Sequence, residues 1–479
     1  MLGIDLGTGS TKAAVFDERG VMLGFGSTSH RVDHPVPGAA ETDPSVWLTS
    51  VAAATRTALT QAGTTSVAAV GLSGQMHGVV FVAADGTTPR PAMLWPDTRA
   101  AAACRHYDRL GTADRTALAN PVVPGMFGPL LAHALAGEPT LRTRLRWALS
   151  PKDWLRLVLT GQAATEPSDA SATLLWDVPA DRWSDATLRA LDVPAGLLPP
   201  VVASAAAAGS LNAVGAELLG VARGTPVAAG AGDTAAAIHG SGLSAGASQL
   251  SIGTGAQIVV PLDDVRPTAV PVTHRYRRAD ATGWYAMAAI QNAGLALEWV
   301  RTLLTVTWEE LLASLDAVAA GADGVTFHPY LTGERTPILD ANVHGAWQGL
   351  SRHHGRAVLC RAALEGVAFA LRDGLQALIT EGVPVGPTRL VGGGSDDARW
   401  RRLLACALGR PLRCHRQAQT SVLGAARLGA AAVGLALPAA DDPPLATIEP
   451  DRELVGELES AWSRWEAHRP LVVTENSLE

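Results

Sequence analysis

Residues 2–16 of the chain read LGIDLGTGSTKAAVF, and residues 250–260 read LSIGTGAQIVV. In both stretches a Gly-Thr-Gly turn separates two short apolar runs, which is typical of two strands joined in a hairpin. The turn carries no bulky side chain, so its backbone N–H groups and its threonine hydroxyl can approach an anion closely. The repeat therefore predicts two related sheets, each with a turn that can bind phosphate, although one copy alone could be an ordinary glycine-rich hairpin.

Two other phosphate-binding patterns fit the sequence less well. The first turn is not a Walker A loop, because a strand rather than a helix follows it. Residues 230–235 read GAGDTA and fit the G-x-G-x-x-A pattern of a dinucleotide-binding turn. That pattern requires an acidic residue about 20 positions further on to bind the ribose. The following strand, SQLSIG, ends without one, so NAD binding is the weaker interpretation.

The length of the chain favours two domains. Its 479 residues exceed the size at which a single hydrophobic core keeps growing. We expect domains at residues 1–242 and 243–479, with the boundary near Gly240–Gly246. Strands alternate with helices along both halves, so the expected fold class is α/β with layered sheets. Hydrophobic residues make up 47% and charged residues 17%, which argues against long disordered segments.

Charge and cysteine usage argue against several kinds of partner. The net charge of −7 is mild and no long basic run is present, so nucleic acid is not an expected ligand. The apolar stretch LGAAAVGLALPAA has 13 residues and is too short to span a bilayer, so no membrane partner is expected. Four scattered cysteines indicate neither zinc nor disulfides, and the first residues lack a signal-peptide pattern, so we expect a cytoplasmic protein. A homodimer is compatible with the sequence, which does not determine the oligomeric state.

Local signals predict several elements. A helix is expected over residues 44–62, with Asp43 or Ser45 as its N-cap and Gly63 at its end. The periodicity of apolar residues predicts a second helix over residues 356–381. Residues 67–86 are typical of a strand, a polar loop and another strand.

Two carboxylates lie beside the glycine-rich turns. Asp5 ends the first strand, and a carboxylate next to bound phosphates usually acts through a hard cation such as Mg²⁺. Asp233 follows Gly230-Ala231-Gly232 and begins a predicted helix, whose dipole favours the charged form that accepts a proton. An ordinary N-cap role is the alternative for Asp233.

The polar loop Gly71–Gly78 interrupts two apolar strands. Gln75 and His77 can each donate and accept hydrogen bonds, as recognition of a polyol or keto-sugar requires. The alternatives are a structural histidine and, for Met76, a core residue. Elsewhere, only Lys12 and Lys152 among 38 basic residues are lysines, which suggests a task that arginine cannot perform or simple chance.

Three motifs together resemble a known ATPase fold. GIDLGTGSTK, SIGTGAQ and LVGGGSDDARW are similar to the first phosphate, second phosphate and adenosine motifs of the actin, heat-shock-protein and sugar-kinase fold. The resemblance implies two duplicated, ribonuclease H-like domains that close over ATP and Mg²⁺ in a deep cleft. The residues that it implies for ATP binding are Thr8, Gly9, Ser10, Lys12, Gly253, Thr254, Gly255, Gly393, Gly394 and Asp397.

The loop GQMHG, with AMLWPDTR, GAGDTAA and FHPYLTGERTPILD, resembles the pentulose-kinase branch of the FGGY carbohydrate kinases over nearly the whole chain. Glycerol kinases of the family carry an Arg-Glu pair in place of Met-His. The resemblance implies ATP-dependent phosphorylation of D-xylulose to D-xylulose 5-phosphate. Asp233 would accept the proton and Asp5 would act through Mg²⁺, so both are assigned to catalysis and to the metal. The residues implied for sugar binding are Gln75, Met76, His77, Trp95, Asp97 and Thr234.

Three departures from that branch leave the identity of the sugar open. Thr234 replaces the usual Asn after the catalytic Asp, Pro96 replaces an Asn, and Leu130 stands where Lys is expected. Another ketose or polyol, such as ribulose or deoxyxylulose, is one alternative acceptor, and a non-catalytic ATP-binding sugar sensor is the alternative from another class. We expect Glu334 and Arg335 to have a structural role, bracing the cleft or pairing with each other on their loop.

Overall fold

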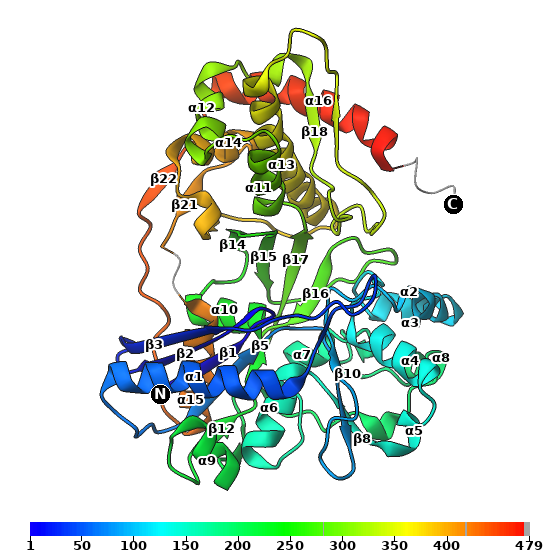
Figure 1. Ribbon diagram of the computed structural model, residues 1–479, viewed down its shortest axis with the longest axis vertical. Helices are drawn as coiled ribbons and strands as arrows, with labels where there is room; N and C mark the ends of the chain where they lie inside the picture. Colours follow the sequence, from blue (N-terminus) through cyan, green and yellow to red (C-terminus); the bar gives the residue numbers. More distant parts are fainter. Residues whose placement is uncertain (281, 417–418, 474–479) are drawn as a thin grey trace.

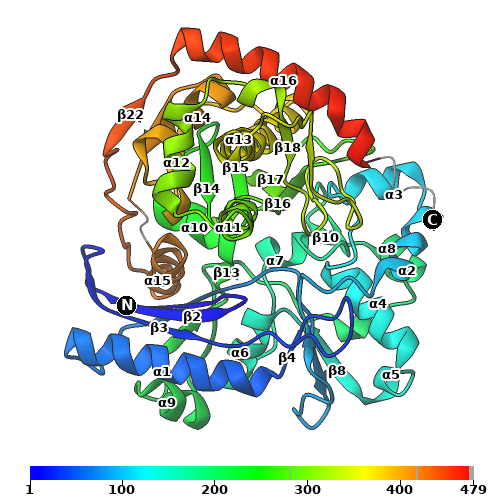
Figure 2. The ribbon, with the colours of Figure 1, turned by 45° about the horizontal axis from the view of Figure 1, so that its top comes forward.

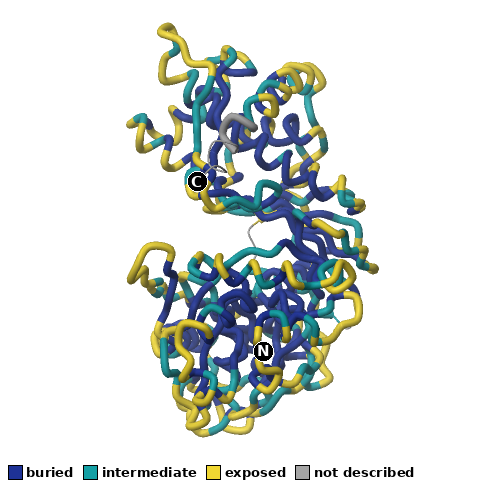
Figure 3. Tube along the Cα trace, turned by 90° about the vertical axis from the view of Figure 1, so that its right-hand side faces the viewer, coloured by how far each residue is buried: buried dark blue, intermediate teal, exposed yellow. Residues whose placement is uncertain are grey.

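The computed structural model describes residues 1–280, 282–416 and 419–473. Its two α/β lobes lie one above the other in Figure 1, and each is built on a seven-stranded mixed sheet. Figure 3 shows buried backbone running through the centre of each lobe. The structure therefore confirms an α/β fold with two duplicated domains.

The sheet of the first lobe has the strand order β11-β12-β5-β1-β2-β3, and β13 pairs with β5 beyond the end of β12. Strands β1, β2 and β3 are antiparallel neighbours, whereas β5 runs parallel to β1. The strands are β1 (Leu2–Leu6), β2 (Ser10–Phe16), β3 (Met22–Ser29), β5 (Val70–Gly74), β11 (Ala207–Ser210), β12 (Pro226–Ala228) and β13 (Ala231–Gly232).

The sheet of the second lobe repeats this arrangement, in the order β16-β17-β15-β14-β20-β21-β22. Strand β14 is antiparallel to β15 and parallel to β20, as β1 is to β2 and β5. Both Gly-Thr-Gly motifs are therefore hairpin turns at equivalent places, as the sequence predicts. The strands are β14 (Ser248–Ile252), β15 (Ala256–Leu262), β16 (His274–Arg277), β17 (Trp284–Ile290), β20 (Thr388–Val391), β21 (Leu412–Cys414) and β22 (Ala446–Ile448).

Four two-stranded sheets complete the strand inventory of the described residues. They pair β4 (Glu41–Thr42) with β7 (Ala92–Met93), β6 (Val80–Ala83) with β8 (Leu145–Leu149), β9 (Trp176–Asp177) with β10 (Arg182–Trp183), and β18 (Thr326–His328) with β19 (Ala346–Gln348).

Helix boundaries follow the predicted capping signals. Helix α1 (Pro44–Ala62) begins at a proline, its N-cap Asp43 accepts a hydrogen bond from the Ser45 backbone N–H at 2.9 Å, and it ends at Gly63 in the left-handed conformation. The second predicted helix is α13 (Arg356–Thr380), which spans the centre of the second lobe (Figure 1). The longer helices are α4 (Phe127–Gly137), α6 (Pro151–Thr160), α10 (Asp233–Ser241), α11 (Gly294–Leu303), α12 (Trp308–Ala317), α13 (Arg356–Thr380), α14 (Ala398–Leu408), α15 (Thr420–Ala432) and α16 (Arg452–Val473). The shorter ones are α2 (Ala101–Cys104), α3 (Thr112–Ala117), α5 (Leu141–Arg144), α7 (Pro167–Ser171), α8 (Asp185–Ala190) and α9 (Ala213–Leu219).

Helix α15 comes late in the sequence, yet it lies with the first lobe (Figure 1). Gly3 and Gly71 are direct partners across β1 and β5, and together they form a flat strip on which the helix rests. A Cβ atom on Gly71 would lie 1.7 Å from the Ala425 carbonyl oxygen, and one on Gly3 would lie 2.2 Å from the Val422 carbonyl oxygen. Only glycine permits this approach, so the two glycines set the position of the helix over the sheet.

The two lobes also meet through strand β16. The Asn120 side chain of the first lobe donates to the Arg275 carbonyl at 2.9 Å and accepts from the Arg275 N–H at 3.0 Å. The Ser171 hydroxyl accepts from the Arg277 N–H at 2.9 Å. In Figure 2, α7 and β13 of the first lobe lie next to β16 and α10 at this junction. None of the helices within the described part of the chain is both long and apolar enough to cross a membrane.

Replacing Gly71 by Ala should loosen the contact between α15 and the sheet. The added Cβ would overlap a backbone carbonyl, and overpacking of this kind typically costs about 1–3 kcal/mol of unfolding free energy. Chemical denaturation measures the loss. Gly456→Ala is the matched control, because this position of α16 has no heavy atom within 4 Å and a helical alanine is favoured by about 1 kcal/mol. Equal stability of both variants would contradict the proposed fit.

Candidate active site

Two carboxylates meet where three neighbouring strands end. Asp5 on β1 pairs in register with Ser73 on β5, and Ser73 pairs with Ala231 on β13, two residues before Asp233. The carboxylate of Asp5 accepts hydrogen bonds from the Ser73 hydroxyl at 3.0 Å and from the Ser421 hydroxyl of α15 at 2.8 Å. Asp5 is thus fixed by the sheet on one side and by the docked helix on the other.

Asp233 is the first residue of α10, and Gly232, not Asp233, is the N-cap residue. The N-cap interpretation of Asp233 is therefore wrong. One carboxylate oxygen accepts from the Thr234 backbone N–H at 2.5 Å and from the Thr234 hydroxyl at 3.1 Å. Burial and then repulsion from Asp5 raise the pKa of Asp233 to about 6. A carboxylate with a pKa near neutrality is suited to accept a proton from a hydroxyl group.

A cavity of about 270 Å³ lies between the lobes and joins the three glycine-rich motifs. Gly392, at the end of β20, has a φ of 107° and lies directly on β14, where a Cβ would come within 2.2 Å of the Ile252 carbonyl oxygen. The close contact places the third motif against the second Gly-Thr-Gly turn. The cavity is lined by Lys12, Gln249, Gly253, Gly392, Gln419 and Ser421, among others.

Two of the residues predicted for ATP, Lys12 and Gly253, line this cavity, whereas Asp397 has another partner. The turn residues of both motifs are exposed or half-buried, and Gly393 and Gly394 form a short 3₁₀ turn beside Ile252. Asp397 is the N-cap of α14 and accepts from the backbone N–H groups of Arg399 and Trp400 at 2.8 and 3.2 Å. The Arg399 side chain also pairs with this carboxylate, so Asp397 caps the helix in the structure, and its contact with ATP stays a prediction.

The polar loop after β5 holds His77 in an unusual conformation. Its φ is 72°, which is uncommon for a residue other than glycine and occurs often at functional sites. The ring Nδ1 lies 2.9 Å from the Ala172 carbonyl oxygen and must donate its proton there. Burial and the nearby charge of Arg335 lower the pKa of His77 to about 4, so the ring is neutral and Nε2 is an acceptor.

Gln75 and Met76 connect this loop to its surroundings. The Gln75 amide donates to the Gly7 carbonyl at 3.4 Å, and its buried Oε1 atom has no hydrogen-bond donor among the described residues. Met76 contacts Gly232, where a Cβ would lie 2.8 Å from the Met76 Cγ atom. Tyr285 of the second lobe donates to the Met76 sulfur at 3.6 Å. Met76 therefore packs between the His77 loop and the start of α10.

The loop of residues 92–99 (AMLWPDTR) has one part that faces the site and another that supports it. Trp95 donates from Nε1 to the Thr8 hydroxyl at 2.9 Å, which links the loop to the first Gly-Thr-Gly turn. Asp97 is fully buried, and its oxygens accept from the Ala40 N–H at 3.1 Å and from Arg99. We therefore assign Asp97 to holding the loop and Trp95 to lining the site. Leu130, one of the three departures from the expected pattern, is a fully buried core residue of α4.

Three strands of the first sheet end side by side and carry the two carboxylates, and each lobe has one Gly-Thr-Gly turn. This arrangement defines a phosphotransferase of the sugar-kinase class. Models of the N-terminal and C-terminal domains of the FGGY family of carbohydrate kinases match residues 1–240 and 242–433. The chain belongs to this family.

Several characterised proteins resemble the chain over most of its length. It is 33% identical to a xylulose kinase of Escherichia coli over 89% of both chains. It is 32% identical to a glycerol kinase of Aromatoleum aromaticum, over 91% of this chain and 90% of the relative. A crystal structure of a xyloylose kinase from Brucella ovis superposes with a TM-score of 0.90 at 34% identity and covers 99% of both chains.

Behind the start of α10 lies a buried ionic cluster that the sequence did not reveal. The fully buried Lys152 ammonium lies 2.7 Å from Asp153, 3.1 Å from Asp169 and 3.6 Å from Glu166. Burial lowers the pKa of Lys152, but the attraction of these carboxylates outweighs it and holds the pKa above its usual value. The sequence offered one signal only, the retention of a second lysine in an arginine-rich chain.

This cluster holds the backbone that precedes Asp233. Lys152 and Arg156 both donate to the Ala229 carbonyl, at 3.4 and 2.7 Å. The Ser168 hydroxyl, itself bonded to Glu166, accepts from the Gly232 N–H at 2.9 Å. Cβ atoms on Gly74 and Gly230 would lie 3.0 and 3.1 Å from the Lys152 side chain. The lysine stem therefore passes between two glycines.

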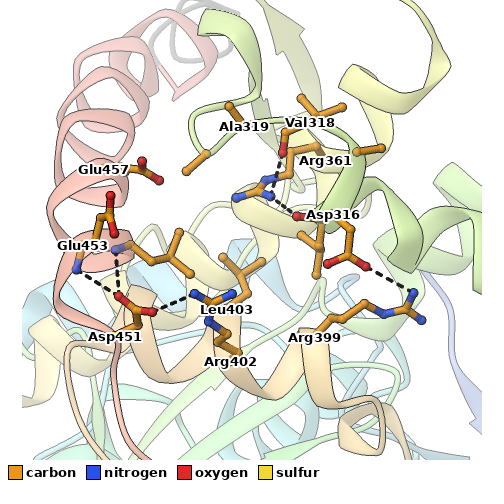
Figure 4. Close-up of a pocket in the computed structure, with 14 residues that line it drawn as sticks. Asp316, Val318, Ala319, Arg361, Arg399, Arg402, Leu403, Asp451, Glu453 and Glu457 are labelled. Atoms are coloured by element: carbon orange, nitrogen blue, oxygen red, sulfur yellow. Dashed lines mark hydrogen bonds and ion pairs between the residues drawn. The ribbon is translucent and has the colours of Figure 1, made fainter.

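A second cavity, of about 340 Å³, lies far from Asp5 and Asp233, between the end of α12, α14 and α16 (Figure 4). Its arginines already have partners. Arg402 pairs with Asp451 at 2.7 Å, Arg399 pairs with Asp397, and Arg361 pairs with Glu365 and donates to the Val318 carbonyl. The pocket therefore has no excess of positive charge with which to hold an anion.

Replacing Lys152 by Met should destabilise the protein strongly. The substitution leaves buried carboxylates without their cation, and breaking a buried ion pair in this way costs about 3–5 kcal/mol of unfolding free energy. Lys152→Arg should not fully restore the stability, because the planar guanidinium differs in shape from the compact ammonium that the three carboxylates surround. Arg301→Gln, at an exposed ion pair with Glu298, is the control and should cost at most about 1 kcal/mol. A full rescue by arginine would contradict the fit.

The low pKa of His77 predicts a flat pH response of sugar binding. With a pKa of about 4, the imidazole is neutral throughout the physiological range, and protonation that would remove the Nε2 acceptor begins only in strong acid. In Asp233→Asn, which lacks the carboxylate whose pKa is about 6, the dissociation constant for the sugar should vary by less than about twofold between about pH 5.5 and about pH 8. A tenfold rise per pH unit below about 6.5, as for an exposed histidine, would show that the ring titrates normally.

Proposed function

We propose that the protein transfers the γ-phosphate of ATP to the terminal hydroxyl of D-xylulose and releases D-xylulose 5-phosphate. The observation that carries the proposal is Asp233, a carboxylate with a pKa near 6 that lies beside Asp5 and contacts the His77 loop through Met76 and Gly232. One edge of the first sheet thus offers a proton acceptor, a second carboxylate and a neutral polar loop.

In this proposal Asp233 accepts the hydroxyl proton as the sugar oxygen forms a bond to phosphorus and the bond from phosphorus to the β-γ bridging oxygen breaks, leaving ADP. The residues of both Gly-Thr-Gly turns hold the phosphates through backbone N–H groups, and Lys12 lines the cavity beside them. No enzyme group attacks phosphorus. The interlobe site limits the access of water that would otherwise compete with the sugar.

The carboxylates fit a divalent cation brought by the nucleotide. Asp5 and Asp233 repel each other, and no third His, Cys, Asp or Glu of the described chain joins them in a metal cluster. Mg²⁺ usually takes one or two carboxylates plus substrate phosphates and water, so this sparse donor set suits it. When bound, Mg²⁺ neutralises phosphate charge, and Asp5, held by two serine hydroxyls, is the residue that would support it.

The choice of D-xylulose rests on the relatives and on the loop. The xylulose kinases that resemble the chain cover most of its length, and Met76 and His77 stand where the glycerol-kinase pattern has an Arg-Glu pair. Thr234 retains a hydrogen bond to Asp233 although it replaces the expected Asn. A glycerol kinase at 32% identity makes another polyol or ketose the second candidate. The paired carboxylates favour a catalyst over a sugar sensor.

A panel of acceptors tests the proposed activity directly. ADP release with ATP and Mg²⁺ should be low without sugar, should rise most with D-xylulose, and should rise less with ribulose, deoxyxylulose, glycerol or sugar acids. Faster turnover of one of the other acceptors would replace D-xylulose as the substrate. Equal ADP release with and without every sugar would remove the kinase assignment for this chain.

Asp233→Asn should abolish most of the turnover and leave sugar binding intact. The amide cannot accept the proton, and loss of a general base typically lowers the rate about 10²–10⁴-fold. The KM for D-xylulose should change little, because the amide keeps the shape of the side chain. Asp185→Asn, at an exposed aspartate in the first turn of α8, is the matched control and should keep wild-type turnover. An active Asp233→Asn variant would rule out this mechanism.

A further inference from the structure

A guanidinium without a carboxylate partner faces the proposed sugar site. Arg335 lies on the loop that follows β18 in the second lobe, and it is half-buried. Among residues 1–280, 282–416 and 419–473, its side chain has no hydrogen bond or ion pair, and the guanidinium lies over the face of Trp95, 5.8 Å from the Arg335 Cζ atom to the ring centroid. A cation that is partly removed from water without a counter-charge is costly unless a ligand pairs with it.

The neighbouring Glu334 carboxylate attracts the Arg335 charge, but the two side chains form no ion pair within the described residues, so the pairing alternative holds only through the Arg335 backbone N–H. The buried Glu334 carboxylate accepts from the backbone N–H groups of Gln291 and Arg335 at 2.6 and 2.8 Å and from the Asn292 amide at 3.2 Å. It is engaged in fixing the loop backbone. The loop is thereby rigid at its base, and the guanidinium extends from it toward the first lobe.

Apart from Glu334, the groups that face the guanidinium are neutral. Trp95 is bonded to Thr8 of the first phosphate turn, and the pKa of His77 is lowered by burial and by the Arg335 charge. Tyr276 donates to or accepts from His274 at 2.8 Å, and burial and Arg335 lower the pKa of His274 as well. The guanidinium of Arg335 therefore makes no direct bond to a carboxylate and lies beside neutral hydrogen-bonding groups, near the loop that holds Met76 and His77.

We propose that Arg335 binds the acceptor sugar from the second lobe and recognises its keto group. This inference rests on the proposed function. A carbonyl oxygen can only accept hydrogen bonds, and a guanidinium can only donate them. The neutral His77 Nε2 atom is the complementary acceptor for a sugar hydroxyl. A donor and an acceptor supplied by opposite lobes match the adjacent carbonyl and hydroxyl of a ketose better than the uniform hydroxyl groups of a polyol.

The same arrangement couples sugar binding to the closure of the lobes. His77 and Trp95 belong to the first lobe, whereas Arg335 belongs to the second. A sugar that bonds to both sides favours the closed arrangement, in which the phosphate turns of the two lobes also approach each other. Arg335 is thus a substrate-contacting residue that the motifs for ATP and for Met-His do not include.

Arg335→Gln tests the inference through a split between kinetic constants. The KM for D-xylulose should rise at least about tenfold, because a hydrogen bond to a charged donor is lost, while the KM for ATP stays within about twofold. The KM of Arg335→Lys for D-xylulose should lie between those of the wild type and Arg335→Gln, since lysine keeps the charge and loses the planar set of donors. Arg301→Gln, at an exposed ion pair with Glu298 on the same lobe, is the matched control and should behave as wild type.

A second readout separates recognition of the keto group from a merely structural role. Xylitol lacks the carbonyl, so its inhibition constant should change much less in Arg335→Gln than the KM for D-xylulose. The preference of the wild type for the ketose should therefore largely disappear in the variant. Equal weakening of both ligands, or unchanged KM values with lower thermal stability, would overturn the inference.

The proposed function and this inference fail in different ways. If wild-type protein does not phosphorylate D-xylulose, the substrate assignment is wrong, and the Arg335 variants are then compared with the best ketose from the acceptor panel. If wild-type protein uses D-xylulose and Arg335→Gln retains its KM, the kinase assignment stands and the role of Arg335 is wrong.

Discussion

The proximity of the Asp5 and Asp233 carboxylates is the feature on which the proposed mechanism depends. The two carboxylates come from positions 5 and 233, and the parallel pairing of β1, β5 and β13 brings them to one edge of one sheet. Their proximity, added to burial, raises the pKa of Asp233 toward neutrality. In the proposed mechanism the same pair of charges would also attract the cation that a nucleotide carries, so one electrostatic feature would serve both proton transfer and phosphate binding.

The scaffold maintains this arrangement with contacts that have little to do with the ligand. Gly3 and Gly71 let α15 rest directly on the sheet, which brings the Ser421 hydroxyl to Asp5. On the other side, the buried Lys152 cluster holds the backbone before Asp233 in place. Helix α15 acts through close packing and the Lys152 cluster acts through buried charges, so the site tolerates little displacement of the helix or of the cluster.

The sequence was informative wherever the signal was local. The two Gly-Thr-Gly hairpins, the bounds of α1 and the helical start at Asp233 follow from turn and capping chemistry, and the structure has all three. The α/β class and the family follow from motifs of the same kind. Residues far apart in the chain were beyond this reasoning, because no short-range pattern links Ser421 to Asp5 across 416 positions. For Asp397 and Asp97, motif membership predicts ligand contacts but gives no sign of the local bonds with which these carboxylates cap a helix and hold a loop.

A crystal structure with a non-hydrolysable ATP analogue, Mg²⁺ and D-xylulose tests the central claim most directly. The account predicts the triphosphate between the turns at Gly7–Gly9 and Gly253–Gly255, with the terminal sugar hydroxyl within hydrogen-bonding distance of Asp233. Phosphates bound away from both turns, or a sugar hydroxyl that faces a group other than Asp233, would contradict it.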